Sequence, residues 1–210
     1  MKKMLKISLF IALFAATSVA YSQISIGAKA GLNLANVLTD DDEADPKMLP
    51  SFQVGVVVEL GLTESVAIQT GASVQGKGFK EESEFLGEKF TFKAMPMYVQ
   101  VPAHIVYNGS GFFVGAGPYV AFGIGGKFKA EGGGNSDSES ISFGNSDTDD
   151  MAPLDFGIGA QAGVNVGPVK IGAGYDFGLA QIIPKDQRGD GSPSVKNGVI
   201  NVFVSYFFGQ

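Results

Sequence analysis

Two arms of alternating residues flank a glycine-proline pair late in the chain. Every second residue from Leu154 to Val166 is apolar, and the same alternation runs from Val169 to Leu179. The residues between the apolar ones are mostly glycine, with a few polar side chains. A period of two on both sides of Gly167-Pro168 predicts a β-hairpin. Each arm exceeds about ten residues, the length that a tilted strand needs to cross a bilayer.

The same alternation recurs along the rest of the chain. Six further segments show it: Ile24–Asn36, Phe52–Leu62, Val66–Lys77, Phe90–Tyr107, Phe112–Phe128 and Gly198–Phe208. Together with the hairpin they predict eight strands. Long connections follow every odd-numbered strand and short turns follow the second, fourth and sixth, so an up-and-down arrangement places all long loops at one end. This asymmetry, with an even number of strands, is typical of outer-membrane barrels.

Two connections and one strand have unusual sequences. Residues 78–89 predict a charged loop, and residues 130–151, rich in Gly, Ser, Asn and Asp, predict a mobile, solvated loop. The apolar phase changes within 90–107, so we expect a β-bulge near Ala94–Pro96. Pro102 lacks an amide hydrogen and should remove one ladder hydrogen bond in the middle of that strand.

The polar positions of the strands distinguish a membrane barrel from a soluble, lipocalin-like one, which also alternates. Strands that face water need many Lys, Glu and Thr side chains. Here the polar set is mostly glycine, which suits a narrow lumen, and the apolar set is nearly free of charge, as contact with hydrocarbon requires. We therefore predict an all-β fold: a closed, eight-stranded, antiparallel, up-and-down transmembrane β-barrel.

The first 22 residues have the pattern of a secretory signal peptide. Three lysines precede an apolar core, Ile7–Ala16, that is too short to span a membrane, and Ala20-Tyr21-Ser22 supplies small residues for cleavage before Gln23. We expect a signal peptide at 1–22 and a single barrel domain at 23–210. The alternative is an N-terminal membrane anchor, which the short core disfavours.

Charge and cysteine content exclude several classes of protein. The net charge is -6, and losing three lysines with the leader takes the mature chain to about -9, so nucleic acid is not an expected partner. The absence of cysteine excludes disulfides and thiolate metal sites.

Four segments resemble the PorT-like, OmpX-type family of small outer-membrane β-barrel proteins. They are Gly27–Asn33, Met97–Pro102, Gly157–Gly163 and the aromatic ending at Phe208. The likeness covers nearly the whole mature chain and implies an integral outer-membrane protein, although Gly209-Gln210 follow the final aromatic. The implied partners are outer-membrane lipids, periplasmic chaperones and the barrel-assembly machinery during biogenesis, and, as PorT-like resemblance permits, envelope or secretion-system proteins. The family is broad and implies no single activity.

An eight-stranded barrel leaves an interior just wide enough for side chains. We expect a polar network in the lumen made of Lys29, Glu59, Gln69, His104, Gln161, Asn165, Lys170 and Asp176. Buried charges normally occur paired, so the network should plug the lumen, with Lys29 paired to Glu59 near the periplasmic end. The alternative is a pathway for protons or solutes.

No cofactor, metal or catalytic group is expected. His104 is the single histidine, but our register points it into the lumen, and the chain has no Gly-x-Ser-x-Gly motif. The acidic segments 40–45 and 147–150 are more consistent with solvated loop carboxylates than with a calcium site, because they lack the ligand spacing of an EF-hand.

The long loops offer candidate contacts: Asp40, Asp41, Asp42, Arg188 and Asp190. Arg188-Gly189-Asp190 spells an adhesion tripeptide, but so short a match also simply makes a turn. The expected function is therefore non-enzymatic, an envelope structural role or binding through loops. The alternatives are a small porin or secretion-system accessory, and a lipid-modifying enzyme. We place the long loops outside the cell and both termini in the periplasm.

Overall fold

The computed structural model describes residues 24–41, 44–85, 87–189 and 191–209 of the 210-residue chain. The predicted signal peptide lies outside the described residues. The elements are β1 (Ile24–Thr39), β2 (Leu49–Gly61), β3 (Val66–Gly76), β4 (Phe79–Phe85), β5 (Glu88–Pro102), β6 (His104–Asn108), β7 (Phe112–Gly132), β8 (Asn135–Ser140), β9 (Leu154–Val166), β10 (Val169–Gly178), η1 (Lys185–Gln187) and β11 (Val195–Phe208). In this described part, no helix is long and apolar enough to cross a membrane.

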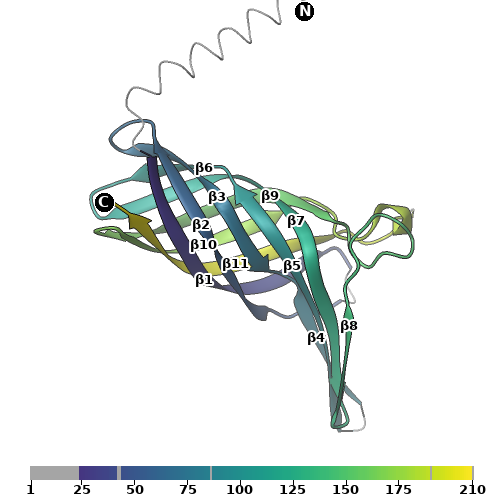
Figure 1. Ribbon diagram of the computed structural model, residues 1–210. Coiled ribbons are helices and arrows are strands. Elements are labelled where there is room, and N and C mark those ends of the chain that lie inside the picture. The colour runs from purple at the N-terminus through teal and green to yellow at the C-terminus, as the bar shows by residue number, and fades with distance from the viewer. Residues whose placement is uncertain (1–23, 42–43, 86, 190, 210) are drawn as a thin grey trace, which may run out of the picture.

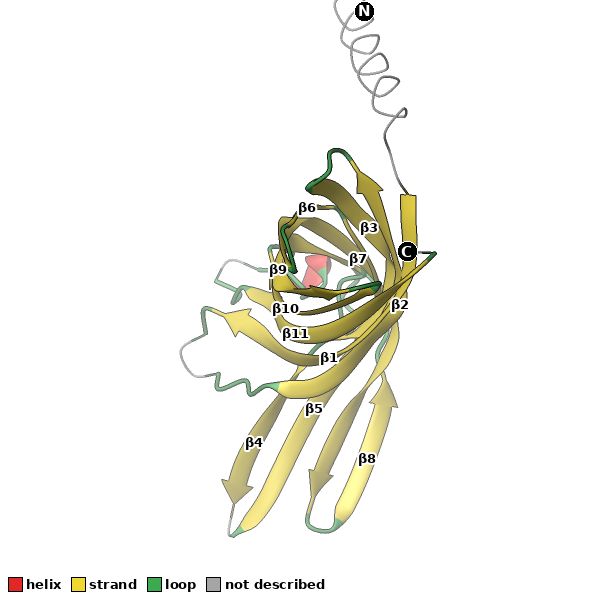
Figure 2. Ribbon diagram, turned by 90° about the vertical axis from the view of Figure 1, so that its left-hand side faces the viewer, coloured by secondary structure: helices red, strands yellow, loops and turns green. Residues whose placement is uncertain are grey.

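The strands form a closed antiparallel ring of eight positions (Figures 1 and 2). β5 and β6 share one position, because both pair with β3 on one side and with β7 on the other. β1 pairs with β2 and with β11, so the first and last strands meet. Closure satisfies the backbone groups that an open edge would leave unpaired in lipid. The predicted fold class is confirmed.

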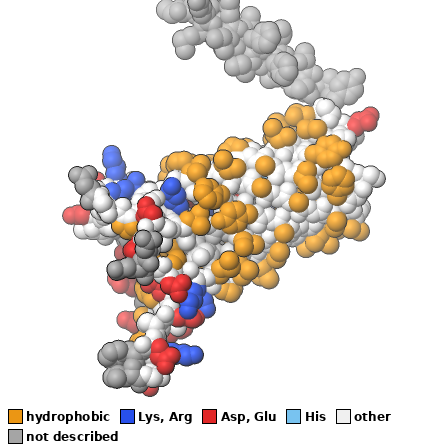
Figure 3. Space-filling view, turned by 180° about the vertical axis from the view of Figure 1, so that it is seen from behind, with side chains coloured by type: hydrophobic (Ala, Val, Ile, Leu, Met, Phe, Trp, Pro, Cys, Tyr) orange, Lys and Arg blue, Asp and Glu red, His pale blue; other side chains and the backbone are white. Residues whose placement is uncertain are grey.

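The outer surface of the barrel is an apolar belt (Figure 3). Ile26, Val56 and Val164 point outward and are 52%, 54% and 48% exposed, whereas Gln53 and Gln69 point inward and are 3% and 5% exposed. The alternation in the sequence therefore matches the pleat of the strands, with apolar residues outside and polar residues inside.

Residues 78–89 are not a loop, and β strands also extend into residues 130–151. β4 pairs with β5, β7 continues to Gly132, and β8 pairs back onto β7. We call the projecting part, made of β4, residues 88–95, residues 126–132 and β8, the flared sheet (Figures 1 and 2). Its charged residues alternate with phenylalanines, and the rings of Phe79, Phe92 and Phe128 pack in sequence, with centroids 6.4 and 5.5 Å apart. Aromatic packing on one face explains why so charged a segment forms strands.

The irregular strand differs from the prediction in two ways. The bulge lies on the partner strand: Met97 pairs with Gly125 and Tyr98 with Gly123, which leaves Ile124 without a partner. The strand itself breaks at Ala103, between β5 and β6. The Ala103 amide still donates to the Pro118 carbonyl at 2.8 Å. β5 ends at Pro102 because proline has no amide hydrogen for the ladder.

The long loops close over one end of the barrel. Ile141, Met151 and Ile182 are buried together with Val37 and Ala94, and Phe79, Phe128, Phe143 and Val195 pack against them. The predicted solvated loop thus contributes apolar residues to a core beneath the loops. Figure 2, which looks along the barrel, shows η1 at its far end.

Candidate functional site

An ion pair crosses the lumen near the short turns. Lys170 of β10 binds both carboxylate oxygens of Glu59 on β2, at 2.6 and 2.8 Å, and also donates to the Asn108 amide oxygen at 2.7 Å. Gln69 donates to Glu59 at 2.7 Å, and Gln161 donates to Gln69 at 2.6 Å. Four of the predicted lumen residues therefore form one hydrogen-bonded cluster.

The predicted pair between Lys29 and Glu59 is wrong, because Lys170 binds the Glu59 carboxylate instead. The Lys29 ammonium lies instead 3.9 Å from the centre of the Phe203 ring. A cation over an aromatic face is an alternative to an ion pair for a buried lysine. Asp176, on the same level of the lumen, accepts a hydrogen bond from Gln100 at 2.9 Å.

A second ion pair lies closer to the long loops and was absent from the predicted network. The Lys77 ammonium is 2.8 Å from the Asp155 carboxylate, and neither side chain is exposed. Asn197 donates to the same oxygen at 3.0 Å. The Tyr119 and Tyr98 ring centres lie 4.5 and 5.4 Å from the ammonium. Lys77 and Asp155 both occupy polar positions of predicted strands, and that phase was the only signal for them in the sequence.

The remaining predicted lumen residues have no partner in these clusters. His104 is buried, and neither ring nitrogen has a hydrogen-bond partner among the described residues. Asn165 is half-buried near the end of β9, opposite Lys170 in the ladder, and donates to the Phe112 carbonyl at 3.1 Å instead of joining the ion pair. The cavity in the middle of the lumen, which Lys29, His104 and Asp176 help to line, has a volume of only about 30 Å³. Such a space holds no more than a few water molecules.

The candidate loop residues are largely engaged in holding the loops. Arg188 donates to the Ile183 carbonyl at 2.6 and 2.8 Å and to that of Gln181 at 3.1 Å. Asp40 accepts from the Ser194 amide at 2.6 Å, and the Asp41 amide donates to the Thr39 hydroxyl at 3.1 Å. Asp42 and Asp190 lie outside the described residues.

The second acidic segment also acts locally. Asp149 accepts from the amide and hydroxyl of Ser146 at 2.8 and 2.6 Å, and these hydrogen bonds lower the pKa of Asp149. Asp150 accepts from Ser142 in the same way. Nowhere in the described ranges do three or more His, Asp or Glu side chains gather as metal ligands.

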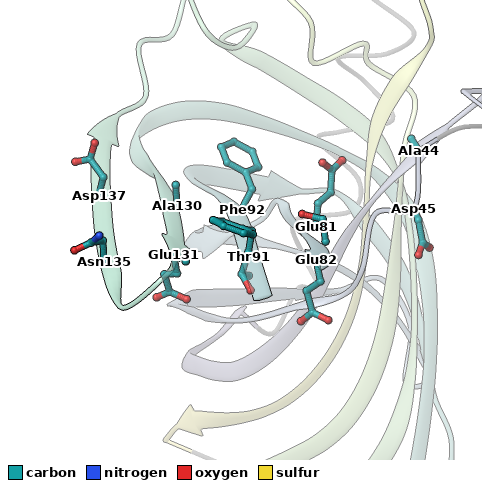
Figure 4. A pocket seen from close by; sticks show the side chains of 13 residues that line it. Ala44, Asp45, Glu81, Glu82, Thr91, Phe92, Ala130, Glu131, Asn135 and Asp137 are labelled. Carbon is teal, nitrogen blue, oxygen red and sulfur yellow. The ribbon is translucent and has the colours of Figure 1, made fainter. Parts of the chain in front are cut away.

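A groove on the flared sheet offers a site for a partner (Figure 4). Its volume is about 560 Å³, and it is lined by Ala44, Asp45, Glu81, Glu82, Ser83, Phe90, Thr91, Phe92, Ala130, Glu131, Gly132, Asn135 and Asp137. Phe90 and Phe92 are 42% and 38% exposed. In Figure 4 the Phe92 ring lies between Glu81 and Asp137. The lining supplies carboxylates and aromatic rings and no lysine or arginine.

A closed ring of eight strands with an apolar belt and a polar, filled lumen defines a transmembrane β-barrel. The family model described as "Outer membrane protein beta-barrel domain" matches residues 14–184, and the chain belongs to that family. The chain is an integral outer-membrane protein.

Solved structures that match the chain are distant in sequence. Ail, the attachment invasion locus protein of Yersinia pestis, is 19% identical with a TM-score of 0.46, and the match covers 88% of this chain and 98% of that one. Neisserial surface protein A is 10% identical with a TM-score of 0.42, covering 88% and 98%. The N-terminal barrel domain of Pseudomonas aeruginosa OprF is 11% identical with a TM-score of 0.33, covering 89% and 99%. No curated protein matches the chain.

Proposed function

We propose that this protein binds a partner outside the cell and uses its barrel as a fixed support. The observation that carries the proposal is the groove on the flared sheet, which stands clear of the barrel. Recognition usually resides on segments that a rigid scaffold presents. In this proposal the long loops and the flared sheet are extracellular, both termini are periplasmic, and residues 1–22 are removed on export.

The chemistry of the groove favours a cationic partner with apolar character, such as a peptide rich in lysine and aromatic residues. Asp45, Glu81 and Asp137 take part in none of the ion pairs of the described residues, so their charge is open to a ligand. Phe90 and Phe92 add an apolar floor against which aromatic or aliphatic groups can pack.

The test is binding of a fluorescent Lys/Phe-rich peptide to the detergent-solubilised protein, compared with a Glu/Phe-rich peptide of the same length. We expect the basic peptide to bind and the Glu81→Gln/Asp137→Asn variant to bind it about tenfold more weakly, as loss of two charge contacts would give. Glu84→Gln is the control, since it removes a carboxylate outside the groove. Equal binding of both peptides, or an equal loss in the control, would exclude the proposal.

The alternatives have less support. A pore conflicts with two levels of buried ion pairs and a central cavity of about 30 Å³. A Ser-His-acid hydrolase conflicts with the lack of any hydrogen-bond partner for His104 among the described residues. A role beside a secretion system, which the PorT-like resemblance permits, can be tested by a pull-down from native membranes, which should then recover the other components.

A further inference from the structure

The two faces of the flared sheet carry opposite charge. Side chains alternate between the faces along each strand, so register assigns each residue to one face. One face, which includes the groove floor, carries Phe79, Glu81, Phe90, Phe92, Phe128, Ala130, Asp137 and Glu139. The other carries Lys80, Glu82, Glu84, Lys89, Thr91, Lys93, Lys127, Lys129, Glu131, Ser136 and Ser138. Glu82, Thr91 and Glu131 of this second face also border the groove, at its rim. Figure 4 agrees, since Glu82, Thr91 and Glu131 point away from the side of Glu81 and Asp137.

Four lysines stand in one row across this second face. In the backbone register Lys47 lies opposite Lys80, Lys80 lies opposite Lys93, and Lys93 lies opposite Lys129. Like charges directly opposite one another repel. Glu82 bridges Lys47 and Lys80 at 3.4 and 2.7 Å, and Glu131 bridges Lys93 and Lys129. Two glutamates against four lysines leave a net positive charge on the row, although the whole chain is acidic.

The lysine row lies next to the apolar belt. Met97, Met95 and Lys93 are alternate residues of β5, so the face that carries Met97 in the belt continues into the row. Four residues of strand span about 13 Å, and a tilt of about 45° reduces the rise along the barrel axis to about 9 Å. That height is close to the headgroup layer, whose thickness is about 5–8 Å on each side of the hydrocarbon.

The direction of the flared sheet brings the same face toward the membrane. In Figure 1 the sheet leaves the barrel sideways instead of continuing along its long axis. In Figure 3 basic side chains lie at the border where the belt gives way to the projecting part. The face that carries Glu81 and Asp137 is turned to the opposite side.

We propose that the lysine row binds phosphate groups of outer-leaflet lipid headgroups, so that the flared sheet lies along the membrane surface with its groove facing outward. Ammonium groups bind phosphate as compact point charges, and clustered lysines beside a membrane-spanning segment attract anionic headgroups. Lipid is the occupant we favour over a protein because the row continues the lipid-contacting face at the height where headgroups already lie. The inference does not depend on which partner fills the groove.

Adjacent residues of β8 offer a matched pair of probes. Ser138 lies opposite Lys129 on the lysine face, whereas Asp137 lies opposite Ala130 on the groove face. The chain has no cysteine, so Ser138→Cys and Asp137→Cys each give one site for a spin label. Relaxation by a nickel chelate attached to lipid headgroups then reports how close each face lies to the membrane surface.

In bilayers containing phosphatidic acid we expect at least about threefold more relaxation at position 138 than at 137, because lysines bound to phosphate hold position 138 nearer the headgroups and relaxation by nickel falls steeply with distance. The difference should disappear in bilayers of a phosphate-free galactolipid, and in Lys93→Gln/Lys129→Gln. Heat-modifiable gel mobility checks that each variant is folded. If the double variant does not fold, Lys127→Gln takes its place, because Lys127 forms none of the four ion pairs of the row, and it should reduce the difference.

Equal relaxation at the two positions would overturn the proposal. So would a difference that persists in the galactolipid, which would mean that phosphate is not what is bound. The proposal would also be overturned if the lysine substitutions left the difference in relaxation between positions 138 and 137 unchanged.

Discussion

At the scale of single residues, the fully buried charged side chains depend most on their ion-pair partners for stability. Lys77 and Asp155 are fully buried 2.8 Å apart, and removing one partner leaves the other charge unpaired in a dry environment. Asn197 and the two tyrosine rings complete the surroundings. The pair links the end of β3 to β9, and Asn197 adds β11 to the contact.

Lys77→Ala should lower the free energy of unfolding by about 3–5 kcal/mol, because Asp155 loses its counter-charge. Lys77→Met/Asp155→Leu should recover most of that loss, since no unpaired charge remains. Urea unfolding in lipid vesicles measures both, and Lys47→Gln, at an exposed pair, is the control that should change little. A double variant as unstable as the single one would contradict this account.

Glu131 is the residue whose titration the structure predicts most clearly. Hydrogen bonds from Lys129 and then Lys93 lower its pKa from 4.5 to about 2. A carboxyl whose folded pKa is depressed contributes stability above its unfolded pKa, and here that contribution is lost as the pH falls from 4.5 to about 2. Carboxyl NMR should give a midpoint near 2 in the native protein, moving toward 4.5 in Lys93→Gln/Lys129→Gln. A native midpoint near 4.5 would show that the bridge is absent in solution.

At the scale of elements, the β9–β10 hairpin depends on glycine for close packing in the lumen. Gly163 pairs with Gly172, and the Phe113 ring lies directly over both. A methyl group on Gly163 would come within 2.1 Å of the Ile171 carbonyl oxygen and 2.6 Å of the Phe113 ring. The glycine-rich polar phase is thus a requirement of a narrow lumen filled with aromatic rings.

Gly163→Ala should destabilise the barrel by about 1–3 kcal/mol, because backbone and ring must shift to admit the methyl group. Gly189→Ala is the matched control, since the nearest atom to its added carbon would be 3.9 Å away. Urea unfolding of the two variants separates packing from a general effect of replacing glycine. Equal stability of both variants would refute the packing argument.

At the scale of the whole molecule, a closed belt surrounds a filled interior. The ion pairs Glu59–Lys170 and Lys77–Asp155 join opposite parts of the wall at two levels, and only about 30 Å³ remains open between them. The barrel is a rigid, plugged support for what projects from it.

Purified protein in a planar bilayer should therefore give no steady conductance steps, because no continuous water path crosses the two clusters. A reconstituted porin in the same bilayer serves as the positive control. Reproducible steps from the native protein would restore the pore hypothesis.

The proposed orientation in the membrane can be tested on whole cells. Ser192→Cys, in the last long loop, should react with a membrane-impermeant maleimide on intact cells, since we place that loop outside. Ser110→Cys, in the short turn before β7, should react only after the outer membrane is permeabilised. The native chain has no cysteine, so labelling is specific. The reverse pattern would invert the topology.

The sequence by itself determined the barrel. Eight alternating segments predict eight strands, and a polar phase made mostly of glycine beside an apolar phase nearly free of charge turns the apolar side chains outward. It also assigned Glu59, Gln69, Gln161 and Lys170 to the lumen, since phase alone decides which face a residue occupies. Two errors came from reading segments one at a time. The charge of residues 78–89 predicts a loop, although Phe79 packs on Phe92. The phase change near Ala94–Pro96 predicts a bulge in that strand, whereas the bulge lies on β7.

Only the tertiary structure decided which charges meet. Glu59 and Lys170 are 111 residues apart, and Lys77 and Asp155 are 78 apart. Such pairs depend on the register of every strand between them and on closure of the ring, where a shift of one residue turns each side chain to the opposite face. For the same reason the lysine row and the groove exist only once β4, β5, β7 and β8 lie side by side.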